Sequence, residues 1–245
     1  MHMLDLQLDP LRLVRFAATH GHNRDQDEDH GYSTHAWLKA CFANLAPKTH
    51  RLMERRDGRL RLLAYSDSDR EALYEHATAY ADPVVTEVAD WNSLASKEMP
   101  TRWKVGQRLG FEVRACPITR SDACERDIYL TSIIRAQATD QAVHSREEVY
   151  QKWFTRQLGP AATSTALHLI GFRRIRGLRR NHDSRGRASS YCTIERPDAL
   201  FAGVLEVRDP LLFTALLERG LGRHRAFGFG MLLLRPPKPD SGTRP

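Results

Sequence analysis

The order in which strands and helices follow one another constrains this chain most. A strand opens the sequence, because Leu4, Leu6 and Leu8 alternate with polar residues. After a polar connection over residues 10–31, the pattern predicts a helix over 32–46, a strand over 59–66, a helix over 68–80 and a strand over 83–91. The order is thus strand, helix, strand, helix, strand.

The second half of the chain repeats this order. It contains a strand over 109–113 that Pro117 closes, a helix over 147–159, strands over 165–172, 188–195 and 201–207, a helix over 210–220 and a last strand. A chain of 245 residues is long enough for two small cores. We therefore predict an α+β protein of two tandem ferredoxin-like βαββαβ domains, residues 1–104 and 105–236, with a disordered tail over 237–245.

The basic balance of the chain suggests a polyanionic partner. The sequence has 37 Lys and Arg against 30 Asp and Glu, a net charge of +7. Seven of the arginines stand in FRRIRGLRRNHDSRGR, residues 172–187, with one aspartate. Such a run is usually a solvated face, but charges this dense repel one another unless a polyanion screens them. Since the arginine fork matches phosphate, we favour a nucleic-acid contact here.

Other partners and compartments receive no support from the sequence. No run approaches the roughly 20 apolar residues of a membrane span, and no signal peptide opens the chain, so we expect a cytoplasmic protein that binds no membrane. The four cysteines lack C-x-x-C spacing and are expected to be free thiols. Residues 19–30 contain three histidines and three aspartates, but their irregular spacing predicts neither a metal site nor another cofactor.

The run GLGRHRAFGFGMLLL, residues 220–234, places four glycines within eleven residues. A helix C-cap and a tight turn account for Gly220 and Gly222. Gly228 and Gly230 remain, and they fit a strand with one bare face or a phosphate-binding loop whose amides point at an anion. Three residues next to them are candidates to meet phosphate, namely Arg223, His224 and Arg225.

The helix over 32–46 is amphipathic and carries a candidate acid–base pair near its start. Ser33 or Thr34 is the expected N-cap. Tyr32 and His35 are three residues apart, so both rings face one spot near the helix N-terminus. The apolar positions of this helix are Leu38, Cys41, Phe42 and Leu45.

Several of these segments together resemble one family. The ending FAGVLEVRDPLLFTALL followed by RGLGRHRAFGFGMLLL is similar to the C-terminal signature of the CasE-type CRISPR RNA endoribonucleases of the RAMP superfamily. VGQRLGFEVRACPITR resembles the segment that opens the second domain of that family, EEVYQKWFTRQLG its helix with a buried Trp, and GYSTHAWLKACF its Y-x-x-H-x-x-L helix. Arg223 and His224 depart from the small residue or proline usual in the family, and the long connection before the His helix resembles the relatives in type IV systems.

This resemblance implies a function and a set of site residues. The family cuts the CRISPR repeat transcript beside a stem-loop, without a metal, through attack of a 2′-hydroxyl, and leaves a 2′,3′-cyclic phosphate and a 5′-hydroxyl. The implied catalytic groups are His35 as acid or base, Tyr32, and Arg225 or Arg223 at the phosphorane, with Arg24 and His30 in reserve. An RNA-binding hairpin is implied at residues 172–187, and the expected contacts are Arg173, Arg174, Arg176, Arg179, Arg180, Arg185, Arg187, Arg120, His224, Gly228 and Gly230.

We therefore predict an endoribonuclease that stays bound to the mature CRISPR RNA as a subunit of an effector complex. The main alternative is a non-catalytic RNA-binding subunit of the same fold, in which His35 is only structural. A DNA-binding regulator is a third interpretation, and it is disfavoured because no helix-turn-helix spacing is found.

Overall fold

The first domain is a four-stranded antiparallel sheet covered by helices. In the computed structural model, which describes residues 1–22, 30–121, 124–182 and 188–237, the strand order is β2-β3-β1-β4. The alternating leucines of the first strand, Leu4, Leu6 and Leu8, are buried in the core of this domain. Its strands are β1 (His2–Leu8), β2 (Thr49–Glu54), β3 (Leu60–Ser66) and β4 (Ala89–Glu98), and its helices are α1 (Pro10–Thr19), α2 (Gly31–Phe42), η1 (Ala43–Leu45), α3 (Arg70–Tyr80) and α4 (Pro83–Thr86).

The second domain repeats the order of the first. Its sheet runs β10-β5-β9-β8, so in each domain the first and third strands of the motif are central and the second and fourth are at the edges. The prediction of tandem ferredoxin-like domains is confirmed. The elements are β5 (Arg108–Ala115), the hairpin β6 (Ile118–Ser121) and β7 (Cys124–Asp127), α5 (Ile128–Thr139), α6 (Arg146–Leu158), β8 (Ala162–His182), β9 (Ala188–Val207), α7 (Pro210–Arg219), η2 (Arg225–Phe227) and β10 (Leu233–Arg235).

The connection expected over residues 10–31 was wrong, because it contains α1. The Asp9 side chain accepts hydrogen bonds from the backbone N–H groups of Leu11 and Arg12, and Pro10 occupies the first helical turn. Both features favour helix initiation. Leu13 and Phe16 then lie one turn apart and pack into the first core.

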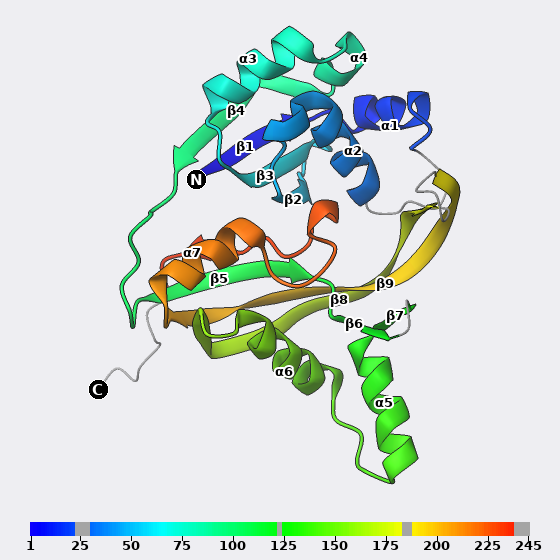
Figure 1. The fold of residues 1–245 in the computed structure, drawn as a ribbon, viewed down its shortest axis with the longest axis vertical. Helices are drawn as coiled ribbons and strands as arrows, with labels where there is room; N and C mark the ends of the chain where they lie inside the picture. The colour runs from blue at the N-terminus through cyan, green and yellow to red at the C-terminus, as the bar shows by residue number, and fades with distance from the viewer. Residues whose placement is uncertain (23–29, 122–123, 183–187, 238–245) are drawn as a thin grey trace.

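Other boundaries also differ from the expectation. The strand predicted over 83–91 is the short helix α4 followed by β4 from Ala89, and the strand β2, the helix α5 and the β6–β7 hairpin were missed. In Figure 1, α5 projects away from the body of the second domain. Of its residues only Ala136 is buried, although Leu130, Ile133 and Ile134 share one face of the helix.

The strands predicted over 165–172, 188–195 and 201–207 belong to one long hairpin. β8 and β9 pair antiparallel from Ala162 with Val207 to His182 with Ala188, with register shifts near Ala166 and Gly171. The hairpin reaches from the second sheet toward α2 (Figure 1). The basic segment between the first two of these predicted strands is therefore largely strand itself, and the basic hairpin implied by the resemblance is present.

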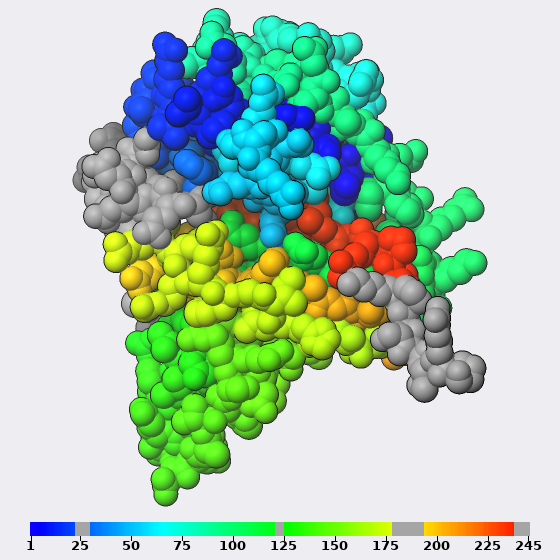
Figure 2. Space-filling view, turned by 180° about the vertical axis from the view of Figure 1, so that it is seen from behind, coloured from blue at the N-terminus to red at the C-terminus, as the bar shows by residue number. Residues whose placement is uncertain are grey.

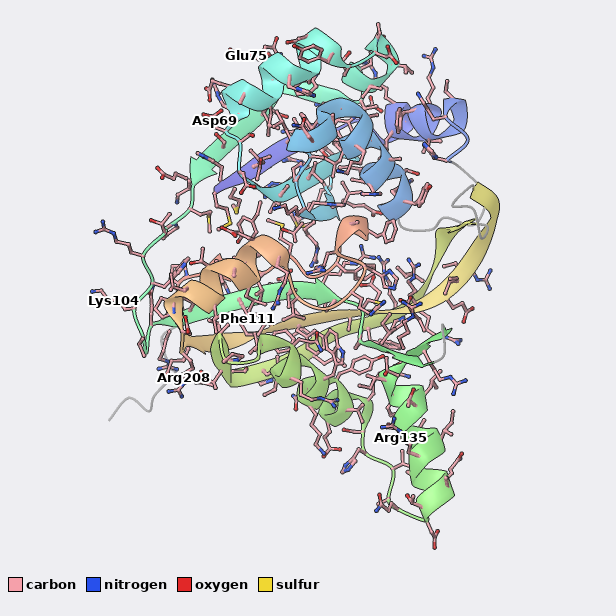
Figure 3. All side chains as sticks on the ribbon, viewed as in Figure 1. Asp69, Glu75, Lys104, Phe111, Arg135 and Arg208 are labelled. Atoms are coloured by element: carbon pink, nitrogen blue, oxygen red, sulfur yellow. The ribbon has the colours of Figure 1, made fainter. Side chains whose placement is uncertain are left out.

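The two domains share an apolar interface. Leu63 and Tyr65 point away from the first core and join the core of the second domain. The Tyr65 hydroxyl donates to the backbone carbonyl of Leu232 over 2.7 Å. Figure 2 shows the β2–β3 hairpin, in cyan, directly above β8, in yellow-green, and Figure 3 shows Phe111 inside the second domain and Arg135 on the projecting α5.

Candidate active site

The first turn of α2 faces the glycine-rich run across the domain interface. The Tyr32 ring lies parallel to the Phe227 ring with 6.1 Å between centroids, and the His35 ring meets the same phenylalanine edge-on at 5.5 Å. Phe227 belongs to η2, which follows the helix α7. The sequence prediction that Tyr32 and His35 face one spot agrees with this geometry, and the structure adds that the spot is the glycine-rich run.

The start of α2 lies earlier than predicted. His30 is the N-cap residue, with a left-handed backbone (φ 53°) and no capping hydrogen bond from its side chain. Ser33 and Thr34, the expected N-caps, are instead buried inside the helix. The earlier start places Tyr32 in the first helical turn.

His35 is half-buried, and its surroundings favour the neutral imidazole. Burial lowers the pKa of His35 below its usual value of 6.5, and the nearby Lys39 charge lowers it further. A neutral imidazole has a free nitrogen lone pair at neutral pH. His35 is therefore in the protonation state that a general base requires.

A second histidine, missed in the sequence, lies behind this site. His50 on β2 is 1 % exposed, and neither of its ring nitrogens has a hydrogen-bond partner among the described residues. Burial lowers its pKa to about 3, with smaller contributions from His35 and Arg114. A Cβ added at Gly228 would lie 3.6 Å from Nε2 of His50, an ordinary contact, so the loop borders this ring and glycine is favoured there by its φ of 84°. No spacing rule marks His50, because the strand that carries it was not predicted.

The glycine-rich run is a loop over residues 228–230, so of the two alternatives for these glycines the strand with one bare face is wrong. Gly228 and Gly230 have φ of 84° and 82°, and β10 begins only at Leu233. The amide of Gly228 donates to the carbonyl of Arg225, and that of Gly230 donates to the carbonyl of Arg114. Since both amides are already bonded within the protein, they do not point together at an anion, as the phosphate-loop interpretation requires.

The three cationic candidates in this run have partners inside the protein. Nε of Arg223 and Nε2 of His224 contact the two carboxylate oxygens of Glu125 on β7, at 3.2 and 2.7 Å. Burial and the Arg196 charge lower the pKa of His224 to about 4, although Glu125 opposes the shift. Arg225 donates to the carbonyl of Arg219, at the end of α7. Glu125 is a part of this cluster that sequence reasoning missed.

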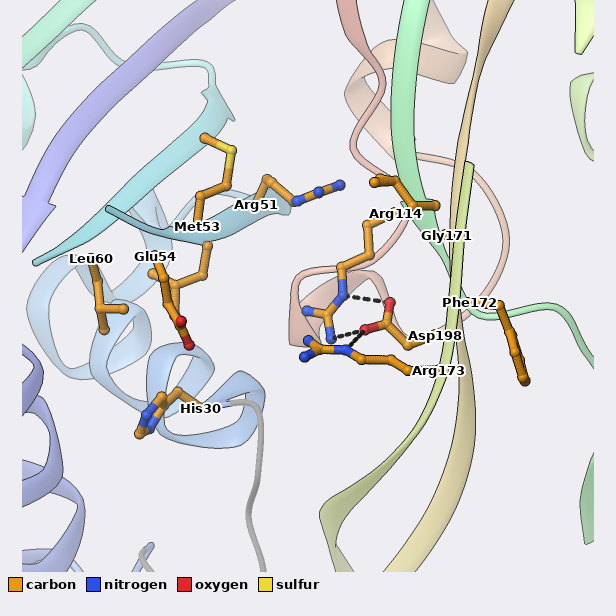
Figure 4. Close-up of a pocket in the computed structure, with 12 residues that line it drawn as sticks. His30, Arg51, Met53, Glu54, Leu60, Arg114, Gly171, Phe172, Arg173 and Asp198 are labelled. Carbon is orange, nitrogen blue, oxygen red and sulfur yellow. Dashed lines mark hydrogen bonds and ion pairs between the residues drawn. The ribbon is translucent and has the colours of Figure 1, made fainter. Parts of the chain in front are cut away.

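A cavity of about 420 Å³ lies between the two domains, beside the start of α2. We call it the interdomain cavity. Figure 4 shows His30 on one wall, Arg51 reaching in from β2, and Arg114 and Arg173 both bonded to Asp198. The remaining lining residues are Leu52, Met53, Glu54, Leu60, Gly171, Phe172 and Leu200.

The long hairpin presents the predicted arginines of β8. The side chains of Arg174 and Arg176 are exposed and lie 3.4 and 3.7 Å from Glu195 on β9. Arg120 is exposed on β6. The side chains of Arg179 and Arg180, and the whole of Arg24, Arg185 and Arg187, lie outside the described parts of the chain.

The comparison with known families decides the identity of the chain. A model of the family described as CRISPR associated protein matches residues 1–236. The chain belongs to this family. The family predicted from the sequence motifs is thereby confirmed.

Solved structures match this CRISPR-associated protein along almost its whole length. A CRISPR endoribonuclease Cse3 bound to a 19-nucleotide RNA is 21 % identical, with a TM-score of 0.62 and coverage of 96 % of this chain and all of the other. Cse3 of Thermus thermophilus, bound to an RNA representing a pre-cleavage complex, is 19 % identical with a TM-score of 0.61 over 96 % and 98 %. Cas6e of Escherichia coli K-12 is 20 % identical with a TM-score of 0.60 over 96 % and 100 %. These matches show the same fold.

No curated protein sequence matches this chain. Within the described residues, no helix combines the length and apolar character needed to cross a bilayer.

Proposed function

We propose that this protein is an endoribonuclease that binds CRISPR repeat RNA at a stem-loop and cuts it beside the stem. The observation that carries the proposal is the meeting of Tyr32 and His35 with the loop residue Phe227, next to a basic cavity and a basic hairpin. The shared fold with endoribonucleases solved with RNA supports it. Further support comes from the motif order of the sequence.

The proposed reaction needs no metal. Neutral His35 takes the proton of the 2′-hydroxyl, the 2′ oxygen bonds to the adjacent phosphorus, and the bond from phosphorus to the 5′ oxygen breaks. The leaving 5′ oxygen takes a proton, and Tyr32 is proposed to donate it or to orient the phosphate. The products are a 2′,3′-cyclic phosphate and a 5′-hydroxyl, so the atoms balance without a co-reactant.

Arginines supply the positive charge. Arg225 and Arg223, on the same run as Phe227, are proposed to stabilise the phosphorane, although Arg223 must first exchange its contact with Glu125. Arg174 and Arg176, with Arg120, are proposed to track phosphates of the stem. Such contacts hold the product stem as well as the substrate stem, which explains how the protein would remain with the mature RNA in an effector complex and take part in antiviral defence.

A non-catalytic RNA-binding subunit is the second candidate. The half-buried position of His35 and its edge-on contact with Phe227 are also what a purely structural histidine would make. In that case, the basic hairpin grips RNA and no bond is cut.

Cleavage of the cognate repeat RNA in EDTA distinguishes the two. Wild type, His35→Ala and Tyr32→Phe would be compared at saturating protein, with end-group analysis of the products. We expect the wild type to leave a cyclic phosphate and His35→Ala to lose roughly 100-fold or more in rate. Tight binding by the wild type without cleavage would favour the non-catalytic subunit, and full activity of His35→Ala would transfer the role to the arginines.

A further inference from the structure

The interdomain cavity holds two arginines on one carboxylate. Nε and Nη2 of Arg114 donate to the two oxygens of Asp198 at 2.8 and 3.0 Å, and Nε of Arg173 donates to the same carboxylate at 2.8 Å. One carboxylate neutralises only one guanidinium. Because the side chain of Arg173 is 65 % exposed, its charge is available to a ligand that enters the cavity.

A third arginine lacks a full set of partners. Arg51 on β2 is only 9 % exposed, yet its Nη1 atom has no hydrogen-bond partner among the described residues. Nη2 of Arg51 lies 3.5 Å from Glu112, a longer separation than a good charge-assisted hydrogen bond. Burial is also the main cause that lowers the pKa of Arg51, which is the expected effect of a poorly compensated buried charge. An anion beside this guanidinium would satisfy it.

The rest of the wall is largely apolar. Met53 and Leu60 lie on the side of the first domain, and Leu200 on β9 lies opposite them. Glu54 is exposed at the end of β2 and is the carboxylate that a bound anion must avoid. The volume of about 420 Å³ lies within the range of small-molecule sites. Guanidinium groups next to apolar surface fit a nucleotide, whose phosphate and base need those two environments.

The position of the cavity relates it to the cleavage site. His30 lines it and is the N-cap of α2, two residues before Tyr32 and five before His35. The proposed function puts the cut beside the stem, and we infer in addition that the stem held by the hairpin arginines lies on the 5′ side of that cut. The strand that continues past the scissile phosphate is then the one left to enter the cavity.

We propose that the interdomain cavity binds an unpaired nucleotide on the 3′ side of the scissile phosphate, with its phosphate on Arg51 and Arg173 and its base against Leu60 and Leu200. This placement of the RNA rests on the proposed function. The site selects substrates whose stem is followed by single-stranded RNA, since neither a blunt stem nor a duplex supplies an unpaired nucleotide to the cavity.

The test measures what a flank adds to binding. Two stem-loop RNAs, one ending at the cut and one carrying a short unpaired 3′ flank, would be titrated against the protein, both with 2′-deoxyribose at the cleavage position. For the wild type we expect the flank to tighten binding by roughly tenfold, the size of one charge-assisted contact. Arg51→Met should abolish this gain. Arg55→Met, at the exposed turn of the β2–β3 hairpin, should keep it.

A second variant changes the opposite wall of the cavity, on β8. Gly171 lines the cavity, and a Cβ there would lie 3.4 Å from Cβ of Leu200, an ordinary contact. Gly171→Leu should therefore fill the space and also remove the gain from the flank. Thermal unfolding of each variant confirms that it is folded before its affinity is compared.

Three results would overturn the proposal. The first is a wild type that gains nothing from the flank, and the second is Arg51→Met losing blunt and flanked RNA equally. The third is a rise in the thermal stability of the protein with uridine monophosphate, without any gain in affinity from the flank. That result would assign the cavity to a free nucleotide. This binding test is independent of the cleavage assay that tests the proposed function. A gain in affinity from the flank that depends on Arg51 supports the cavity site even if no RNA is cut.

Discussion

At the scale of the residue, the protonation of His35 depends on a charge that can be removed. Lys39 lies one turn further along α2, and its charge is the second cause, after burial, of the lowered pKa of His35. If neutral His35 is the base, cleavage slows as the pH falls through this pKa. Lys39→Met raises the pKa and should move the acidic limb of the pH–rate profile to higher pH. Single-turnover rates measure the shift, and Lys97→Met on β4 is the control. An unmoved limb in Lys39→Met would argue against His35 as the titrating base.

Gly230 offers a residue-scale test of the loop. A Cβ at this position would lie 2.1 Å from the carbonyl oxygen of Leu221, and its φ is 82°. Gly230→Ala should destabilise the protein by roughly 3 kcal/mol through strain and overlap together. Gly58→Ala has a similar φ of 78° and meets nothing within 4 Å, so it isolates the backbone cost, about 1 kcal/mol. Urea unfolding measures the free energy of unfolding of both variants. Equal losses of stability would show that the loop around Gly230 shifts to accommodate the added methyl group.

Sequence reasoning reached some of these residues and missed others for a physical reason. Tyr32 and His35 share a helix face, which periodicity predicts, and the resemblance associated them with the glycine-rich run. Glu125 contacts Arg223 and His224 from a hairpin almost a hundred positions away, and no local pattern encodes such a contact. His50 is buried where the two domains pack together, so no local sequence pattern marks it.

At the scale of the element, the β8–β9 hairpin should determine the salt dependence of RNA binding. The side chains of Arg174 and Arg176 are 68 % and 54 % exposed, and both share Glu195. Substitution of each by Gln should reduce the slope of log affinity against log salt by roughly one for every phosphate that the arginine neutralises. Titrations at several salt concentrations measure the slope. Arg208→Gln, equally exposed beyond the other end of β9, should leave it unchanged, and an identical effect of all three would indicate a general charge effect.

The elements themselves were predicted where a pattern is strong. The leucine alternation of β1 and the stripe of α2 are confirmed, because each buries one face. α1 has a readable start at Asp9 and Pro10 and buries Leu13, Phe16 and Ala17, and it was missed because it was grouped with the polar residues 19–30 that follow it. α5 was missed although Leu130, Ile133 and Ile134 recur at helical spacing in its sequence.

At the scale of the whole molecule, the shared interface should make the two domains unfold together. Leu63 belongs to the first sheet but packs in the core of the second domain. Leu63→Ala should cost about 2–5 kcal/mol and increase amide exchange in both domains. Calorimetry with hydrogen exchange tests this, and Leu62→Ala, on the opposite face of β3, is the matched variant for the first core. Two resolved transitions in the wild type would refute the coupling.

The order of α2 and the glycine-rich run along the chain has a consequence for synthesis. A ribosome releases α2 early, and the first domain can fold on its own sheet as it emerges. Phe227 and the two arginines before it follow only after α7, and β10 is the last strand to be added. An incomplete chain therefore carries the histidine without the loop that faces it. If the proposed function holds, a growing chain that has not reached Phe227 lacks the assembled cleavage site and cannot cut the transcripts around it.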